Sequence, residues 1–192
     1  MFFMIKYVDG DTLNVWLKSN KLYEGSVSEV EATLLRIIFK LALGIAYMHS
    51  KGVLHYDIKL DNILMTLSGD PVVSDFGVSA RGNQTEVSNG GHAVEAVVRG
   101  HTPKYSSARL QQVAAELKRK RGEEREQFKQ TNKLTHAEDI FCFAGTVLEM
   151  YAVRGWLHGN TVAELWAERE LWRSLRCASR YRGVCARYWR TA

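Results

Sequence analysis

The 192-residue chain has few cysteines and few prolines: three of the former and two of the latter. The cysteines are Cys142, Cys177 and Cys185. Three cysteines cannot close a disulfide framework, and this spacing is not that of zinc ligands. A reducing intracellular setting is therefore expected, and the length supports one compact domain or two small units.

The sequence also lacks a long uninterrupted apolar run. Its longest mainly apolar stretch, Leu34–Met48, is interrupted by Arg36 and Lys40, which excludes a membrane-spanning segment there. The apolar N-terminal residues end at Lys6, too soon for a signal peptide. No membrane association is expected, and no pattern in the sequence indicates an oligomeric state.

A net charge of +5 is a first hint of nucleic-acid binding, but its distribution argues against that function. Residues 1–154 hold nineteen basic and eighteen acidic side chains, whereas residues 155–192 hold seven Arg and three Glu. Four of the five Trp also fall after residue 154. Binding of nucleic acid is thus not expected of most of the chain, and the C-terminal segment needs its own explanation.

Hydrophobic periodicity predicts a mainly helical chain with a few short strands. Residues 1–8 are expected to form a strand and residues 12–22 a short helix. A long amphipathic helix should follow, with Ser28 and Glu31 as its capping box and Gly52 as its left-handed end. Further strands are expected at 53–54, 63–65 and 72–74, an exposed loop at 80–101, and helices at 110–130, 139–153 and 165–175.

A set of polar residues after the long helix has the chemistry that phosphoryl transfer requires. Asp57 can accept the proton of an attacking hydroxyl, and Lys59 can contact the transferring phosphate. Asn62 and Asp75 supply hard oxygen ligands of the kind that Mg²⁺ prefers. Gly77 gives the backbone freedom to turn after the second of these ligands.

At these positions the sequence resembles the eukaryotic protein kinases. The matching residues are His55, Asp57, Lys59, Asn62, Asp75, Phe76 and Gly77. The resemblance implies an α+β fold with a mostly helical large lobe, ATP and Mg²⁺ as cofactors, and a protein substrate. Within the family, Lys59 two residues after the base points to a Ser/Thr kinase, and His55 with Phe76 would join a stacked internal spine.

The resemblance also implies a nucleotide site near the start of the chain. Residues 5–10 look like the hinge between kinase lobes, with Ile5 gating the adenine pocket. Backbone groups of Lys6 and Val8 would bond adenine, and Leu64 would form the pocket floor. The alternative is a simple edge strand, because hinge sequences are not distinctive.

Two more residues take roles by the same resemblance. Thr102, in a Thr-Pro-Lys-Tyr run, would hydrogen-bond Asp57 and Lys59 beside the substrate. Asp139 resembles the buried aspartate that holds the catalytic-loop backbone through its amides; the alternative is an ordinary helix N-cap.

The sequence departs from the family in several ways. No Gly-rich nucleotide loop and no strand lysine precede residues 1–10, so the expectation is a large lobe (1–153) without the N-terminal lobe. Such a lobe is expected to have weak kinase activity, or none, by itself. Tyr56 replaces the usual Arg, Arg109 stands where the family has Glu, and residues 110–138 contain a charged insertion.

The segment 154–192 stays unassigned, with two interpretations open. Its Trp and Arg residues could form an aromatic-basic helical face, or the segment could be an out-of-frame terminus. Lys118–Arg121 resembles a nuclear-localisation run, and the alternative is a solvated helix face. The protein is expected in the cytoplasm, with the nucleus as the alternative if this run is a localisation signal. A catalytically silent binding module is the alternative to a Ser/Thr kinase.

Overall fold

The computed structural model describes residues 7–19, 26–86 and 92–153, and its centre is the long helix α2 (Val27–Ser50). One face of α2 is buried, at Val30, Leu34, Ile37, Leu41 and Ile45. The helix ends as expected, because Gly52 has φ of 72° just beyond its C-terminus. Its start was predicted two residues too late.

The capping box of α2 is formed by Ser26 and Glu29, and not by Ser28 and Glu31. The backbone N–H of Glu29 donates to Ser26 Oγ, and the Glu29 carboxylate accepts from Ser26 N at 2.7 Å. Both residue pairs have the spacing of a capping box, so the local pattern alone did not select between them.

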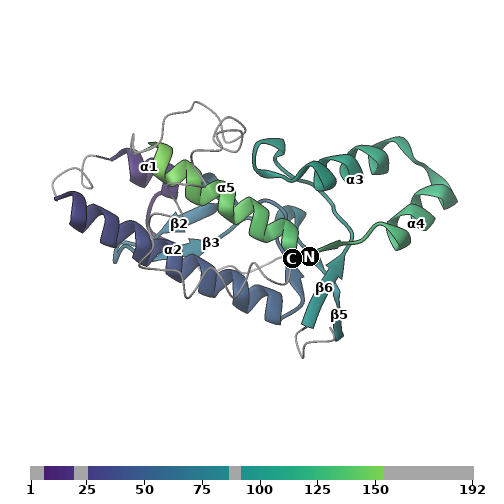
Figure 1. The fold of residues 1–192 in the computed structure, drawn as a ribbon, viewed down its shortest axis with the longest axis horizontal. Helices are drawn as coiled ribbons and strands as arrows, with labels where there is room; N and C mark the ends of the chain where they lie inside the picture. The colour runs from purple at the N-terminus through teal and green to yellow at the C-terminus, as the bar shows by residue number, and fades with distance from the viewer. Residues whose placement is uncertain (1–6, 20–25, 87–91, 154–192) are drawn as a thin grey trace, which may run out of the picture.

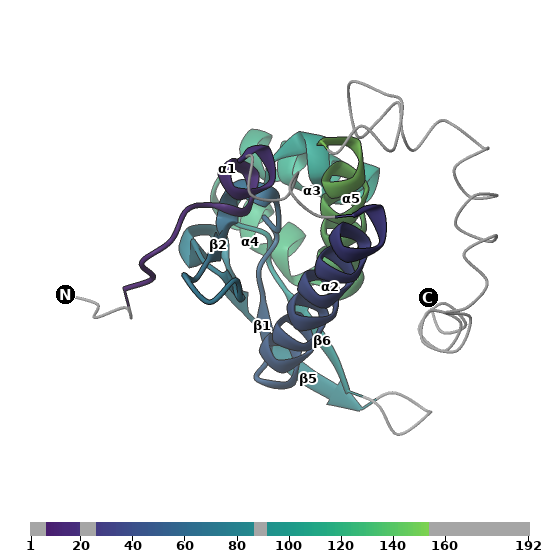
Figure 2. The same ribbon diagram turned by 90° about the vertical axis from the view of Figure 1, so that its left-hand side faces the viewer.

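Two further helices complete the first hydrophobic core. The short helix α1 (Leu13–Lys18) buries Leu13 and Leu17, and α5 (Ala137–Val153) lies against α2 (Figure 2). Met150 of α5 joins the buried residues of α1 and α2 in one cluster. The helix expected at 139–153 therefore begins two residues earlier, while the one expected at 165–175 lies outside the described residues.

The strands form three small antiparallel sheets. β1 (Val53–Leu54) pairs with β4 (Ala80–Arg81), and β2 (Ile63–Met65) pairs with β3 (Pro71–Val73). The third sheet has the order β5 (Asn83–Glu86), β6 (His92–Ala96), β7 (Leu134–Thr135). The expectation of an exposed loop at 80–101 was thus wrong, because main-chain pairing organises its first part.

The charged segment 110–130 forms two helices where one was expected. These are α3 (Ala108–Arg119) and α4 (Gly122–Thr131), which lie apart from the α2–α5 layer (Figure 1). Leu110, Val113 and Leu117 of α3 pack into a second core beside the β1–β4 pair. Three 3-10 turns join these parts: η2 (Leu60–Asn62), η3 (Phe76–Val78) and η4 (Pro103–Tyr105).

The strand expected at residues 1–8 falls mostly outside the described residues. Of its described residues, Tyr7 and Val8 are in no strand. Just beyond them, Thr12 forms an isolated antiparallel bridge with Leu64. No helix in the described ranges is long and apolar enough to cross a membrane.

Candidate active site

The loop that carries the candidate catalytic residues joins β1 to β2. Its apolar side chains alternate with the polar ones and enter three separate hydrophobic clusters. Leu54 and Tyr56 belong to the second core, Ile58 to a small cluster with Cys142, and Leu60 to the first core. Since each anchor is almost fully buried, the intervening side chains are held in fixed places.

Asp57 is the centre of this polar set. It is only 9% exposed, and its Oδ2 accepts hydrogen bonds from Lys59 Nζ at 2.9 Å and Asn62 Nδ2 at 3.0 Å. Its Oδ1 is buried and has no hydrogen-bond partner among the described residues. A buried acceptor without a donor is uncommon, so one carboxylate oxygen is left for a group that the described residues do not provide.

Lys59 links the loop to the segment beyond β6. Its Nζ also donates to Thr102 Oγ1, at 2.8 Å, which joins residues 43 positions apart. Burial would raise the pKa of Asp57, but hydrogen bonds and the charge of Lys59, together with Thr102 and Asn62, lower it below its ordinary value. Asp57 is therefore ionised at neutral pH, as a proton acceptor must be.

The two residues with magnesium-ligand chemistry lie at the ends of neighbouring strands, Asn62 just before β2 and Asp75 two residues after β3. Asn62 precedes β2, and its carbonyl accepts from the backbone N–H of Ser74 at 2.8 Å. Asp75 follows Ser74 directly and has a φ of 59°, and its Oδ1 accepts a hydrogen bond from Gly77 N at 3.2 Å. The described residues contain no group of three His, Cys, Asp or Glu side chains that could hold a metal alone.

His55 fixes the loop on the side of Asp75–Gly77. Its ring packs edge-on against Phe76, with centroids 5.0 Å apart, which is the stacking expected of this pair. His55 Nε2 donates to the Ser74 carbonyl at 2.9 Å, and Nδ1 accepts from Asp57 N at 3.3 Å. Together these bonds select the Nε2–H tautomer of a neutral ring.

Asp139 holds the loop backbone from α5 and is not an N-cap. Its side chain is completely buried, and its carboxylate accepts from the amides of His55 at 2.8 Å and Tyr56 at 2.7 Å. The contact expected from the resemblance is therefore present. His49 Nε2 adds a third hydrogen bond at 2.9 Å. The role of His49 could not be predicted from the sequence, because its partner is 90 residues away.

Tyr56 stands where the resembling family has an arginine, and it is fully buried. Its φ of 63° is unusual for a large side chain, and the Asp139 hydrogen bond stabilises that backbone conformation. The Tyr56 hydroxyl donates to the Leu134 carbonyl at 3.4 Å. Tyr56 thus connects the loop to the second core by packing rather than by charge.

The residues proposed to contact the nucleotide are only partly described. Ile5 and Lys6 lie outside the described residues, and Val8 is half-buried. Leu64 is half-buried on β2 and pairs with Thr12, four residues after Val8. The chain after Val8 thus runs along the strand that carries Leu64.

Comparison with known proteins agrees with this arrangement. The family model described as the protein kinase domain matches residues 1–168. The chain therefore belongs to the protein kinase family, and its mostly helical α+β fold is of the kinase type.

Curated relatives are serine/threonine kinases. The chain is 34% identical over 87 residues, 45% of its length, to the serine/threonine-protein kinase STE20 of Eremothecium gossypii. It is 27% identical over 150 residues, 78% of its length, to the mitogen-activated protein kinase kinase kinase bck1 of Aspergillus fumigatus. The chain spans only 8% of each of these proteins.

Proposed function

We propose that residues 1–153 are the large-lobe segment of a Ser/Thr protein kinase, with a charged insertion at about 110–138. In this proposal Asp57 accepts the proton of a Ser or Thr hydroxyl on a protein substrate. The observation that carries it is that the buried Oδ1 of an ionised Asp57, beside Lys59, has no hydrogen-bond partner within the described part of the chain. Lys59 and Thr102 orient that carboxylate, and the Lys59 ammonium contacts the transferring phosphate.

The donor set fits a magnesium–nucleotide complex. Asn62 and Asp75 offer two oxygen ligands, and Mg²⁺ characteristically uses few protein ligands together with phosphate oxygens. Bound Mg-ATP would supply the phosphoryl group and neutralise its charge. Val8 and Leu64, with Ile5 and Lys6, are proposed to hold the adenine.

Phosphate transfer tests this function. The protein is incubated with labelled Mg-ATP and peptides that carry Ser, Thr or Tyr. A low level of label should enter Ser and Thr peptides, as expected of a large lobe that is only weakly active by itself, and Asp57→Asn should lower this rate by about 10²–10⁴-fold. Asp61→Asn is the matched control, because this exposed neighbour bonds only Asn14 at 2.7 Å among the described residues.

Two results would contradict the proposal. One is transfer that Asp57→Asn leaves unchanged. The other is a melting temperature that does not rise with Mg-ATP, since a ligand that binds only the folded state must stabilise it. A protein that binds peptides but neither nucleotide nor label would instead be a silent binding module.

A further inference from the structure

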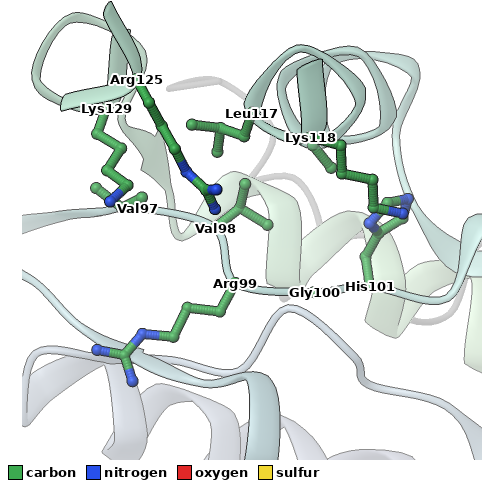
Figure 3. A pocket seen from close by; sticks show the side chains of 10 residues that line it. Val97, Val98, Arg99, Gly100, His101, Leu117, Lys118, Arg125 and Lys129 are labelled. Atoms are coloured by element: carbon green, nitrogen blue, oxygen red, sulfur yellow. The ribbon is translucent and has the colours of Figure 1, made fainter. Parts of the chain in front are cut away.

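A cavity of about 590 Å³ lies between the segment 97–101 and the helices α3 and α4 (Figure 3). Five of its ten lining residues are basic, none is acidic, and the others are apolar or glycine. The basic residues are Arg99, His101, Lys118, Arg125 and Lys129. The kinase chemistry proposed above uses none of them.

Four of these basic side chains converge on the cavity. In Figure 3, Arg125 and Lys129 extend from α4 toward the backbone at 97–98, and Lys118 extends from α3 toward His101. Arg99 points away from the two helices. Basic side chains from two helices and one backbone segment therefore face a single space.

Two of these cations have no acidic partner among the described residues. Arg125 Nε is buried and has no hydrogen-bond partner in the described part of the chain. Lys118 makes no ion pair with any described carboxylate, whereas Lys129 Nζ contacts Glu126 at 2.6 Å. A buried donor without an acceptor destabilises a fold, so Arg125 is expected to have a partner that is not part of the described chain.

His101 contributes a donor without adding charge. Burial, followed by the charge of Lys118, lowers the pKa of His101, and the charge of Asp57 opposes this effect. The ring is therefore neutral at pH 7 and offers an N–H group. Bound negative charge in the cavity would favour its protonated form.

The charges indicate a compact anion rather than a nucleic acid. Two basic residues near the end of α3 that do not line the cavity are paired with acids: Arg119 with Glu116, and Lys120, just after the helix, with Glu124. An extended phosphate backbone would meet this mixed surface, whereas the lining of the cavity holds five basic residues and no acidic one. A phosphate monoester, with about two negative charges and three acceptor oxygens, matches it.

The location of the cavity indicates where such a phosphate comes from. His101 directly precedes Thr102, whose hydroxyl accepts from Lys59 beside Asp57. A phosphate near His101 would thus lie a few residues from the hydroxyl that Asp57 serves. We propose that the cavity binds a phosphoserine or phosphothreonine already present in the protein substrate, an inference that rests on the proposed kinase function.

Binding without nucleotide tests the cavity separately from catalysis. Fluorescence anisotropy compares a labelled random-sequence peptide pool with a fixed phosphoserine and the same pool with serine. The full chain should bind the phosphorylated pool at least ten-fold more tightly. Lys118→Gln and Arg125→Gln should each remove most of that preference.

Arg119→Gln is the matched control, since Arg119 neighbours Lys118 on α3 but does not line the cavity and is bonded to Glu116. It should bind the phosphorylated pool as the unmodified chain does. Equal loss in Arg119→Gln, or equal binding of both pools, would overturn the inference. So would tighter binding of an oligonucleotide that also depends on Lys118. If Arg125→Gln fails to fold, Lys118→Gln alone decides.

A second measurement separates this inference from the kinase proposal. Peptides with one acceptor serine and a phosphoserine one to six residues away are tested for phosphate transfer. Preference for one spacing, lost in Lys118→Gln, supports both proposals. Selective binding without transfer rejects only the kinase proposal, and transfer without phosphate selectivity rejects only the cavity assignment.

Discussion

Replacing Asp139 by asparagine tests how the candidate catalytic loop is held. The carboxylate accepts three hydrogen bonds, from His55 N, Tyr56 N and His49 Nε2. In Asp139→Asn one amide oxygen replaces two carboxylate oxygens, so at least one donor faces an NH₂ group. An unsatisfied buried donor costs about 1–3 kcal/mol, and each remaining bond weakens by about 1 kcal/mol without the charge.

The free energy of unfolding should therefore fall by about 3–5 kcal/mol, a large share of the 5–15 kcal/mol typical of a domain. Urea denaturation followed by circular dichroism measures the change. Asp70→Asn is the control, because Asp70 is exposed and bridges Arg36 and Lys40 at the surface. A loss in Asp139→Asn no larger than that of Asp70→Asn would refute the reasoning.

Three other predictions concern separate parts of the molecule. Gly10→Ala should lower the free energy of unfolding by about 1–3 kcal/mol, because the Cβ of the new alanine would lie 1.7 Å from the Met65 carbonyl oxygen. Gly44 has open space around it, so Gly44→Ala should raise this free energy by about 0.5–1 kcal/mol in the same urea titration. Burial and a neighbouring histidine lower the pKa of His136, so the folded state binds fewer protons than the unfolded one, and the free energy of unfolding should fall as the pH drops below about 6.5. In His136→Gln the decline of this free energy between pH 7 and 5 should be shallower. An unchanged slope would contradict this. Thr102→Ala removes the hydroxyl that accepts from the loop lysine and should slow peptide phosphorylation about ten-fold, with Thr102→Ser restoring the rate.

The polar residues of the candidate site could be predicted from sequence because they lie close together along the chain. Asp57, Lys59 and Asn62 fall within six residues, and the structure joins them by direct hydrogen bonds. The helix α2 was predictable for a similar reason, since its buried face repeats at helical spacing.

Features that depend on distant partners were not predictable. The β5–β6 hairpin has a polar sequence typical of a loop, and its pairing with β7 joins residues about 40 positions apart. The anchoring role of His49 and the cavity between residues 97–101 and α4 likewise depend on the tertiary fold. Periodicity describes one element at a time, so it does not reveal such contacts.

The distribution of anchors along the loop between β1 and β2 has a consequence for its fluctuations. Consecutive anchors at Tyr56, Ile58 and Leu60 belong to three different cores, so the opening of one cluster leaves the loop held by the other two. Its amide protons should exchange with solvent only through the largest cooperative openings of the domain. The backbone around Asp57 would then exchange more slowly than the other irregular segments of the described residues, and its exchange rate would report the integrity of all three cores together.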